Sequence, residues 1–124
     1  MEIMESSSTL NEEELLFDEL EKAVVEYFES DEQRKRRNLL KVLRSNDCRE
    51  TIVKCEDGDK ISNAFVWAGY KNHSDILKCF LDRGMNVNIK DQDGDTALIL
   101  TCNSGCISIV KKLLENHANP DVQK

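Results

Sequence analysis

Between positions 10 and 29 the apolar residues recur at the spacing of one helical face. They follow one another at steps of four, three, one and four residues: Leu16, Leu20, Ala23, Val24 and Phe28. A helix places residues at these steps on one side. Thr9 followed by Glu12 has the spacing of a capping box, in which both side chains bond free backbone N–H groups. We therefore expect a helix over about residues 10–29.

A second helix is expected over about residues 31–44, because Ser30-Asp31 interrupts the first helix and supplies a new N-cap. Its apolar residues are Leu39, Leu40, Val42 and Leu43. Residues 46–60 are rich in Asn, Asp and Gly around a short apolar run at 51–53. We interpret this stretch as a loop, with either an extended segment or a helical turn at the apolar run.

The second half of the chain contains an internal repeat. Residues 75–86, DILKCFLDRGMN, match residues 108–119, SIVKKLLENHAN, at a constant offset of 33 positions. The same offset relates further pairs: Ala64-Phe65 to Ala97-Leu98, and Asn88 to Asp121. A constant period of this length is typical of stacked repeat architectures. Each unit of such a stack has an apolar stripe that a neighbouring unit must cover.

The repeated motifs resemble those of the ankyrin repeat. Residues 91–98, DQDGDTAL, are similar to the hairpin and helix start usually written DxxGxTPLHxA, with Ala97 for the usual Pro and Ile99 for the usual His. Gly105 and the SIVKKLL that follows it at 108–114 resemble the second-helix pattern GHxEIVKLLL. The turn pattern GADVN occurs as GMNVN at 84–88 and as HANPD at 117–121. Thr96 is expected to cap the first helix of its repeat, and Gly84 to end a second helix in the left-handed conformation.

The resemblance covers about half of the chain and implies an all-α fold. It implies a short ankyrin-repeat solenoid, with repeats at 58–90 and 91–123, preceded by one or two N-terminal helices. The first repeat is degenerate, because Ile61 and Asn63 stand where Gly and Thr are usual. A small insertion near Gly58 would explain this departure. Residues 38–43 are either the second helix of a still more degenerate repeat or part of a separate helix.

The charge distribution supports a division of the chain. Twelve acidic groups and one lysine lie in residues 1–33, whereas basic groups outnumber acidic ones in residues 34–124. Such a break is typical of a segment appended to a core. We expect a disordered leader at 1–8, an N-terminal region with an acidic and a basic helix at 9–57, and ankyrin repeats at 58–124.

Composition excludes several classes of function. The formal net charge is −7, which argues against nucleic acid as a partner. The chain has no apolar run long enough to span a bilayer and no basic, apolar leader of the secretory type. Five cysteines without CxxC pairs indicate reduced thiols in a cytoplasmic or nuclear protein.

The residues that carry chemistry elsewhere have simpler explanations in this chain. Asp91, Asp93 and Asp95 alternate as in a calcium loop, but the sixth and twelfth positions hold Thr96 and Cys102 instead of Gly and Glu. Cys102 and Cys106 lack the further His or Cys ligands of a zinc site. Neither His73 nor His117 has a Ser or Cys arranged for nucleophilic catalysis. We therefore predict no enzyme activity, no cofactor, no metal and no small-molecule substrate.

The resemblance implies that the protein is a protein-protein interaction module, used as an adaptor or scaffold. Its partner would lie across hairpin tips and inner helices, which carried over position by position gives Asp59, Lys60, Ser62, Tyr70, Lys71, Lys90, Gln92, Asp93, Asp95, Asn103 and Ser104. Tyr70 is the best anchor, because a rigid aromatic side chain buries much area at low entropic cost. Trp67 aligns with Leu100, a packing position, and is interpreted as core.

Two alternatives to a self-contained binding module remain open. The chain could be an N-terminal fragment of a longer ankyrin-repeat regulatory protein. It could instead be a nuclear transcription cofactor that uses the basic run Arg34–Arg37 as an import signal. The simpler interpretation of that run is a solvated helix face that balances the acidic segment before it.

Overall fold

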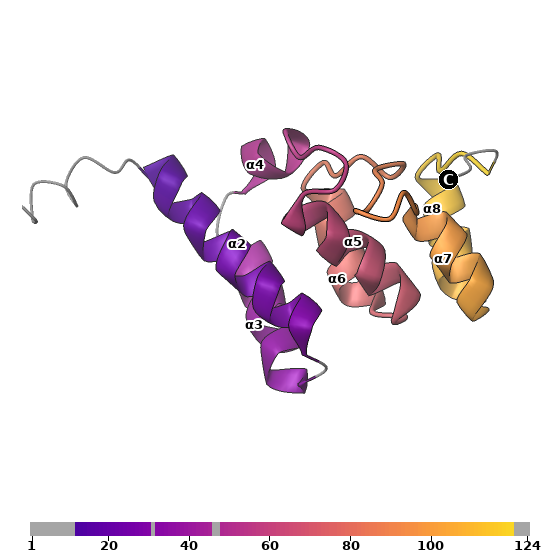
Figure 1. The fold of residues 1–124 in the computed structure, drawn as a ribbon, viewed down its shortest axis with the longest axis horizontal. Helices are drawn as coiled ribbons and strands as arrows, with labels where there is room; N and C mark the ends of the chain where they lie inside the picture. The colour runs from indigo at the N-terminus through magenta and orange to yellow at the C-terminus, as the bar shows by residue number, and fades with distance from the viewer. Residues whose placement is uncertain (1–11, 31, 46–47, 121–124) are drawn as a thin grey trace, which may run out of the picture.

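The computed structural model describes residues 12–30, 32–45 and 48–120. The predicted leader at 1–8, the cap at Thr9 and the N-cap at Asp31 lie outside the described residues. The described part of the chain is helical and contains no strand. Its helices, labelled in Figure 1, are α2 (Glu12–Glu29), α3 (Gln33–Ser45), α4 (Arg49–Val53), α5 (Lys60–Tyr70), α6 (Ser74–Asp82), α7 (Ala97–Ser104) and α8 (Ile107–Glu115).

Three pairs of helices stack side by side. Each pair is consecutive in the chain: α2 with α3, α5 with α6, and α7 with α8. The first helices of the pairs form one row, in which α5 packs between α2 and α7, and α3 packs on α6 behind that row (Figure 1). The α2–α3 pair is therefore the first layer of the stack, and it packs on the nearer of the two layers that the 33-residue period predicts, the α5–α6 pair. The fold is the all-α solenoid expected from the sequence.

Among the residues whose side chains the structure describes, the buried face of α2 differs from the predicted one only at its last position. Leu20, Ala23, Val24 and Tyr27 are buried, whereas Phe28 remains 37% exposed. The hydroxyl of Tyr27 lies 2.7 Å from Nδ1 of His73, at the start of α6. A buried tyrosine needs a partner for its hydroxyl, and the histidine supplies it across 46 residues of sequence. The prediction that Phe28 belongs to the buried stripe was wrong for this reason.

The poorly predictable stretch before α5 contains a helical turn. Helix α4 buries Ile52 and places Lys54 Nζ 2.9 Å from the Glu50 carboxylate. Past α4, the turn at Gly58 has a φ of +83°. The backbone N–H of Gly58 donates to the carbonyl of Lys90, and Asp57 accepts from the N–H of Lys90. The first turn is thereby bound to the next hairpin tip.

The 33-residue period extends to the backbone conformation. The side chain of Thr96 accepts a hydrogen bond from the N–H of Ile99 and so caps α7, as predicted. Gly84 has a φ of +95°, and His117, one period later, has a φ of +70°. Residues with a side chain rarely adopt this left-handed conformation. Its occurrence at His117 shows that the turn geometry is retained where the glycine has been lost.

The core is continuous from α2 to α8. In the middle layer the rings of Phe65 and Phe80 meet edge to face, with centroids 5.8 Å apart. Between the middle and last layers, a Cβ built on Gly69 would lie 3.1 Å from Thr101 Cγ2 and 3.3 Å from Ala97 Cβ. Helices α5 and α7 can approach this closely because Gly69 has no side chain.

Candidate functional site

Three aromatic side chains from two layers meet at the surface of the first-helix row. Phe28, from the end of α2, packs edge-on against Trp67 of α5 with ring centroids 5.6 Å apart. Trp67 in turn stacks on Tyr70, one helical turn further along, at 5.3 Å. We call Phe28, Trp67 and Tyr70 the aromatic cluster.

The aromatic cluster is open to solvent. Tyr70 is 41% exposed and Phe28 37%, while Trp67 is half-buried against the core. The interpretation of Trp67 as core therefore accounts for only part of its environment. The ammonium group of Lys71 lies 5.6 Å from the centroid of the Trp67 ring, within the range of a cation–π contact. The cluster combines large, rigid apolar area with one positive charge.

The structure places most of the predicted partner-binding residues on the surface. Seven are exposed: Asp59, Lys60, Tyr70, Gln92, Asp93, Asn103 and Ser104. Lys71 and Lys90 are half-buried. Only Tyr70 and Lys71 join the aromatic cluster; the others lie at the start of α5, at the hairpin tip and at the end of α7.

Two predicted contact residues are corrected by their burial. Ser62 is fully buried, and its hydroxyl donates to the carbonyl of Glu56 at 2.7 Å. Asp95 is also buried, and its backbone exchanges hydrogen bonds with Asp91. Both residues hold the turns in shape, and neither offers its side chain to a partner. Sequence reasoning also missed Phe28 as a surface residue, since its apolar character and spacing suit a core position equally well.

The alternating aspartates build the hairpin tip. One carboxylate oxygen of Asp91 accepts the backbone N–H groups of Asp93 and Asp95, at 2.9 and 2.8 Å. The neighbouring Gln92 is fixed by Asn63, whose amide accepts from the N–H of Gln92 and donates to its side chain. Of the three aspartates that alternate as in a calcium loop, Asp91 therefore has a structural role, since its carboxylate closes the turn.

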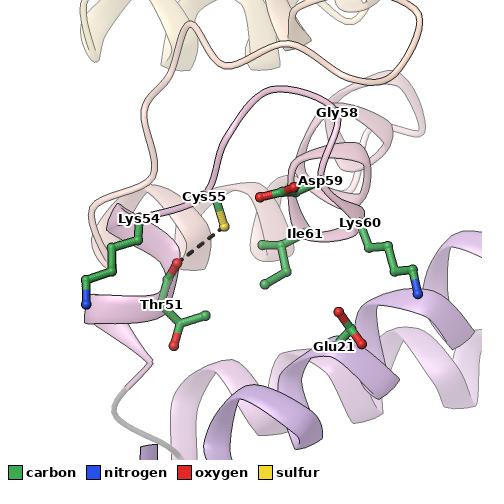
Figure 2. Close-up of a pocket in the computed structure, with 8 residues that line it drawn as sticks. All are labelled: Glu21, Thr51, Lys54, Cys55, Gly58, Asp59, Lys60 and Ile61. Carbon is green, nitrogen blue, oxygen red and sulfur yellow. Dashed lines mark hydrogen bonds between the residues drawn. The ribbon is translucent and has the colours of Figure 1, made fainter. Parts of the chain in front are cut away.

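A pocket lies between α2, α4 and the start of α5. Its volume is about 510 Å³, and Figure 2 shows its lining residues: Glu21, Thr51, Lys54, Cys55, Gly58, Asp59, Lys60 and Ile61. The Cys55 thiol donates to the carbonyl of Thr51 at 3.4 Å. Burial, with the nearby Asp59 carboxylate, raises the pKa of that thiol to about 12. A thiol that stays protonated at neutral pH is not a nucleophile.

Within residues 12–30, 32–45 and 48–120, no cluster of three His, Cys, Asp or Glu side chains could hold a metal ion. Of the helices in these ranges, none has the length and apolar character needed to cross a membrane. The described surface contains exposed aromatic side chains and polar turns that are held by hydrogen bonds.

The basic run on α3 takes part in the stacking of the layers. Arg36 donates to the Asp75 carboxylate of α6 at 3.0 Å, and Lys35 pairs with Glu32 at 3.4 Å. Arg37 is exposed. The Lys35–Glu32 pair fits a run that balances the acidic segment before it, whereas Arg36 joins α3 to α6; the use of the run as an import signal stays a prediction.

The Arg36–Asp75 pair predicts an acid-dependent loss of stability. Burial raises the pKa of Asp75, but hydrogen bonds from Arg36 and the Ile76 N–H, with the Arg36 charge, outweigh it and lower the pKa below the ordinary 3.8. Because the folded-state pKa is the lower one, the contribution is present above about pH 4 and is lost as the pH falls through the folded pKa. Solvent screening limits it to about 1 kcal/mol at most.

We expect Asp75→Asn to lower the urea midpoint at pH 7, with the difference from the unmodified protein shrinking towards pH 3. Asp93→Asn, on the hairpin tip, is the control and should change the midpoint little at either pH. A deficit of Asp75→Asn that is the same at both pH values would contradict the assigned role of the ion pair.

Comparisons with known proteins agree with this geometry. The family model described as ankyrin repeats (3 copies) matches residues 32–124. Inversin of Danio rerio is 41% identical over 54 residues, which is 42% of this chain and 5% of inversin. Ankyrin repeat and KH domain-containing protein mask-1 of Caenorhabditis elegans is 36% identical over 59 residues, 48% of this chain and 2% of that protein. No solved structure matches.

The three matched copies correspond to more than the two repeats that the 33-residue period predicts, since the match begins just before α3. The chain spans only a small part of the length of these two relatives. The stacked helix pairs, the Thr96 cap and the left-handed turn at Gly84 are the structural counterparts of the matched motifs. The chain belongs to the ankyrin repeat family.

Proposed function

We propose that this protein is an adaptor or scaffold whose partner protein docks on the aromatic cluster. The observation that carries the proposal is the exposure of aromatic rings from two layers, with Tyr70 at 41% and Phe28 at 37%. Ankyrin repeats are non-catalytic modules of protein-protein interaction. Within that general role, the exposed aromatic rings support the cluster as the docking surface.

The geometry of the cluster suits a binding hot spot. Aromatic residues dominate interface energetics because they bury large area and have few rotatable bonds. Trp67 is held between Phe28 and Tyr70 and packs on the core, so little order has to be gained when a partner binds. An apolar or aromatic side chain of the partner would find a rigid surface already formed.

The surroundings of the cluster indicate what flanks that anchor in the partner. Helix α2 is strongly acidic, with Lys22 as its single basic residue, and Glu29 follows Phe28 directly in the chain. In the last layer, Asn103 and Ser104 end α7 at the positions that correspond to Tyr70 and Lys71. A basic flank would complement α2, and a polar flank would complement α7.

Tyr70→Ala is expected to weaken partner binding by about 10- to 100-fold, the range of a hot-spot aromatic residue. Partners would be captured from cell extract on immobilised residues 1–124 and identified, and their affinity then measured by calorimetry. Val53→Ala is the matched control, since Val53 is 63% exposed on α4 and away from the cluster. Circular dichroism of both variants should match that of the unmodified protein.

Two outcomes would decide against this surface. One is equal affinity of Tyr70→Ala and the unmodified protein for every captured partner. The other is a loss of binding with Val53→Ala that equals the loss with Tyr70→Ala. Either result would move the interface away from the aromatic cluster.

A further inference from the structure

The two ends of the stack differ in chemical character. The groove between α2 and α3, of about 420 Å³, is lined mainly by charged and polar residues, among them Glu19, Lys22, Glu26, Arg34 and Lys35. The groove on α7 and α8, of about 340 Å³, is mainly apolar and includes Ile99, Val110, Leu114 and Pro120. Repeat stacks need a polar outer face on each terminal unit to remain soluble. The α2–α3 end meets that requirement and the α7–α8 end does not.

The 33-residue period identifies the internal surface to which the apolar end corresponds. Cys102 on α7 occupies the position that Gly69 has on α5. A Cβ on Gly69 would touch Thr101 and Ala97 of the next layer, so this position faces forward along the stack. Cys102 is exposed, and no described residue covers it.

Neighbouring positions show the same relation. Val66 and Leu77 are fully buried in the middle layer, whereas their counterparts Ile99 and Val110 in the last layer are only half-buried. Leu114, the counterpart of Leu81, is 45% exposed. The apolar character needed for an internal interface is therefore present, and only the covering layer is missing.

The described part of the turn after α8 repeats the structure of the turn 33 residues earlier. The N–H of Asn119 donates to the side-chain oxygen of Asn88 at 2.7 Å, which ties this turn to the preceding one. Ala118 is buried, as is Met85 one period earlier. In the preceding copy, the same turn leads into a hairpin tip and α7.

We propose that the α7–α8 end face is an internal interface of a longer stack, covered by a further helix pair that follows residue 124 in the same polypeptide. The incoming helix presents small side chains to Cys102, as α7 presents Ala97 and Thr101 to Gly69. A second copy arriving head to tail would have to bury the charged α2–α3 end against this face, which is costly. The proposal concerns a different surface from the aromatic cluster and does not depend on it.

Adding a repeat to the C-terminus tests whether the α7–α8 end face can pack against a further helix pair. A copy of residues 91–123, with its two cysteines changed to Ser, replaces Lys124, which preserves the 33-residue spacing and the aspartate of the hairpin tip. We expect a higher urea midpoint, a steeper single transition, and at least tenfold slower alkylation of Cys102 by a thiol reagent. Alkylation would be located by mass spectrometry of peptides, because the chain contains four other thiols.

The variant Cys102→Glu provides the control for packing. In residues 1–124 it should be tolerated, because Cys102 is exposed there. In the extended chain it should abolish the gain in urea midpoint, since the glutamate would point into the new interface. If the extended chain gains no stability and Cys102 remains as reactive as before, the face is not an internal interface and the proposal fails.

Two further measurements test the source of the covering pair. An antibody against residues 34–60 should detect a native polypeptide well above the 14.2 kDa of residues 1–124; a single band at 14.2 kDa would overturn the proposal. Sedimentation of residues 1–124 should show a monomer. A dimer that Leu114→Glu dissociates would overturn it in favour of a second copy as the occupant.

Discussion

Replacing Phe65 by alanine is expected to lower the free energy of unfolding by about 3–5 kcal/mol, the usual cost of removing a large buried aromatic ring. Phe65 is fully buried in the middle layer and meets Phe80 edge to face at 5.8 Å. The loss combines the transfer of the ring, the cavity left behind and the missing aromatic contact. The total free energy of unfolding of a domain of this size is about 5–15 kcal/mol. The variant should therefore be close to unfolding at 37 °C.

Phe28→Ala is the matched control for Phe65→Ala. It deletes the same atoms from an aromatic side chain that is 37% exposed, so its effect should be clearly smaller. Urea titrations followed by far-UV circular dichroism measure both variants. Equal losses would mean that Phe65 is not at the centre of the stack, or that Phe28 is far more buried in solution than in this structure.

The second half of the fold could be predicted because its sequence pattern occurs in two copies. The 33-residue offset predicted two successive helix pairs, which are α5–α6 and α7–α8. Thr96 and Gly84 have the predicted cap and turn conformations. Asn72 could not be placed in this way: its φ of +63° corresponds to Gly105 one period later. Asparagine adopts the left-handed conformation more readily than most residues, but the sequence around it does not require that conformation.

The first layer could be predicted only as separate helices. The sequence indicated helices near 10–29 and 31–44, and α2 and α3 occupy these ranges to within a few residues. Nothing local shows that α2 packs on the middle layer, because that contact depends on pairs such as Tyr27 and His73 that are 46 residues apart. The same long-range bond accounts for Tyr27, and not Phe28, as the buried aromatic residue at the end of α2. Helical spacing alone tolerates either Tyr27 or Phe28 inside.

Of the candidate site, the sequence predicted Tyr70 and Lys71 as contact residues, but it did not predict Phe28 or Trp67. Tyr70 could be found because its position relative to the repeat motif places it at the end of an inner helix. Phe28 joins it only because the first layer aligns the end of α2 with the end of α5. Ser62 and Asp95 were assigned to the surface by position, but their hydrogen bonds within the turns draw them inside.

Leu39→Ala is expected to destabilise the whole stack by about 2–5 kcal/mol, the range for a buried leucine. Leu39 is fully buried on α3, which packs on both α2 and α6. The chain has a single tryptophan, Trp67, which lies on α5 in the middle layer and not on α3. Its fluorescence therefore measures unfolding in a different layer from the substitution. Trp67 fluorescence and far-UV circular dichroism should give one shared transition, moved to lower urea concentration.

The neighbouring Leu40→Ala separates this effect from a general intolerance of α3 to substitution. Leu40 is the same residue type, one position along, and only half-buried, so its loss should be smaller. If α2 and α3 were an appendage, Leu39→Ala would split the unfolding into two transitions, with the Trp67 transition close to its original midpoint. A single shifted transition instead requires the three layers to unfold together, which is how a stack behaves when every neighbouring interface is strong. That cooperativity is what would hold Phe28 against Trp67, and so the aromatic cluster depends on the first layer for its shape.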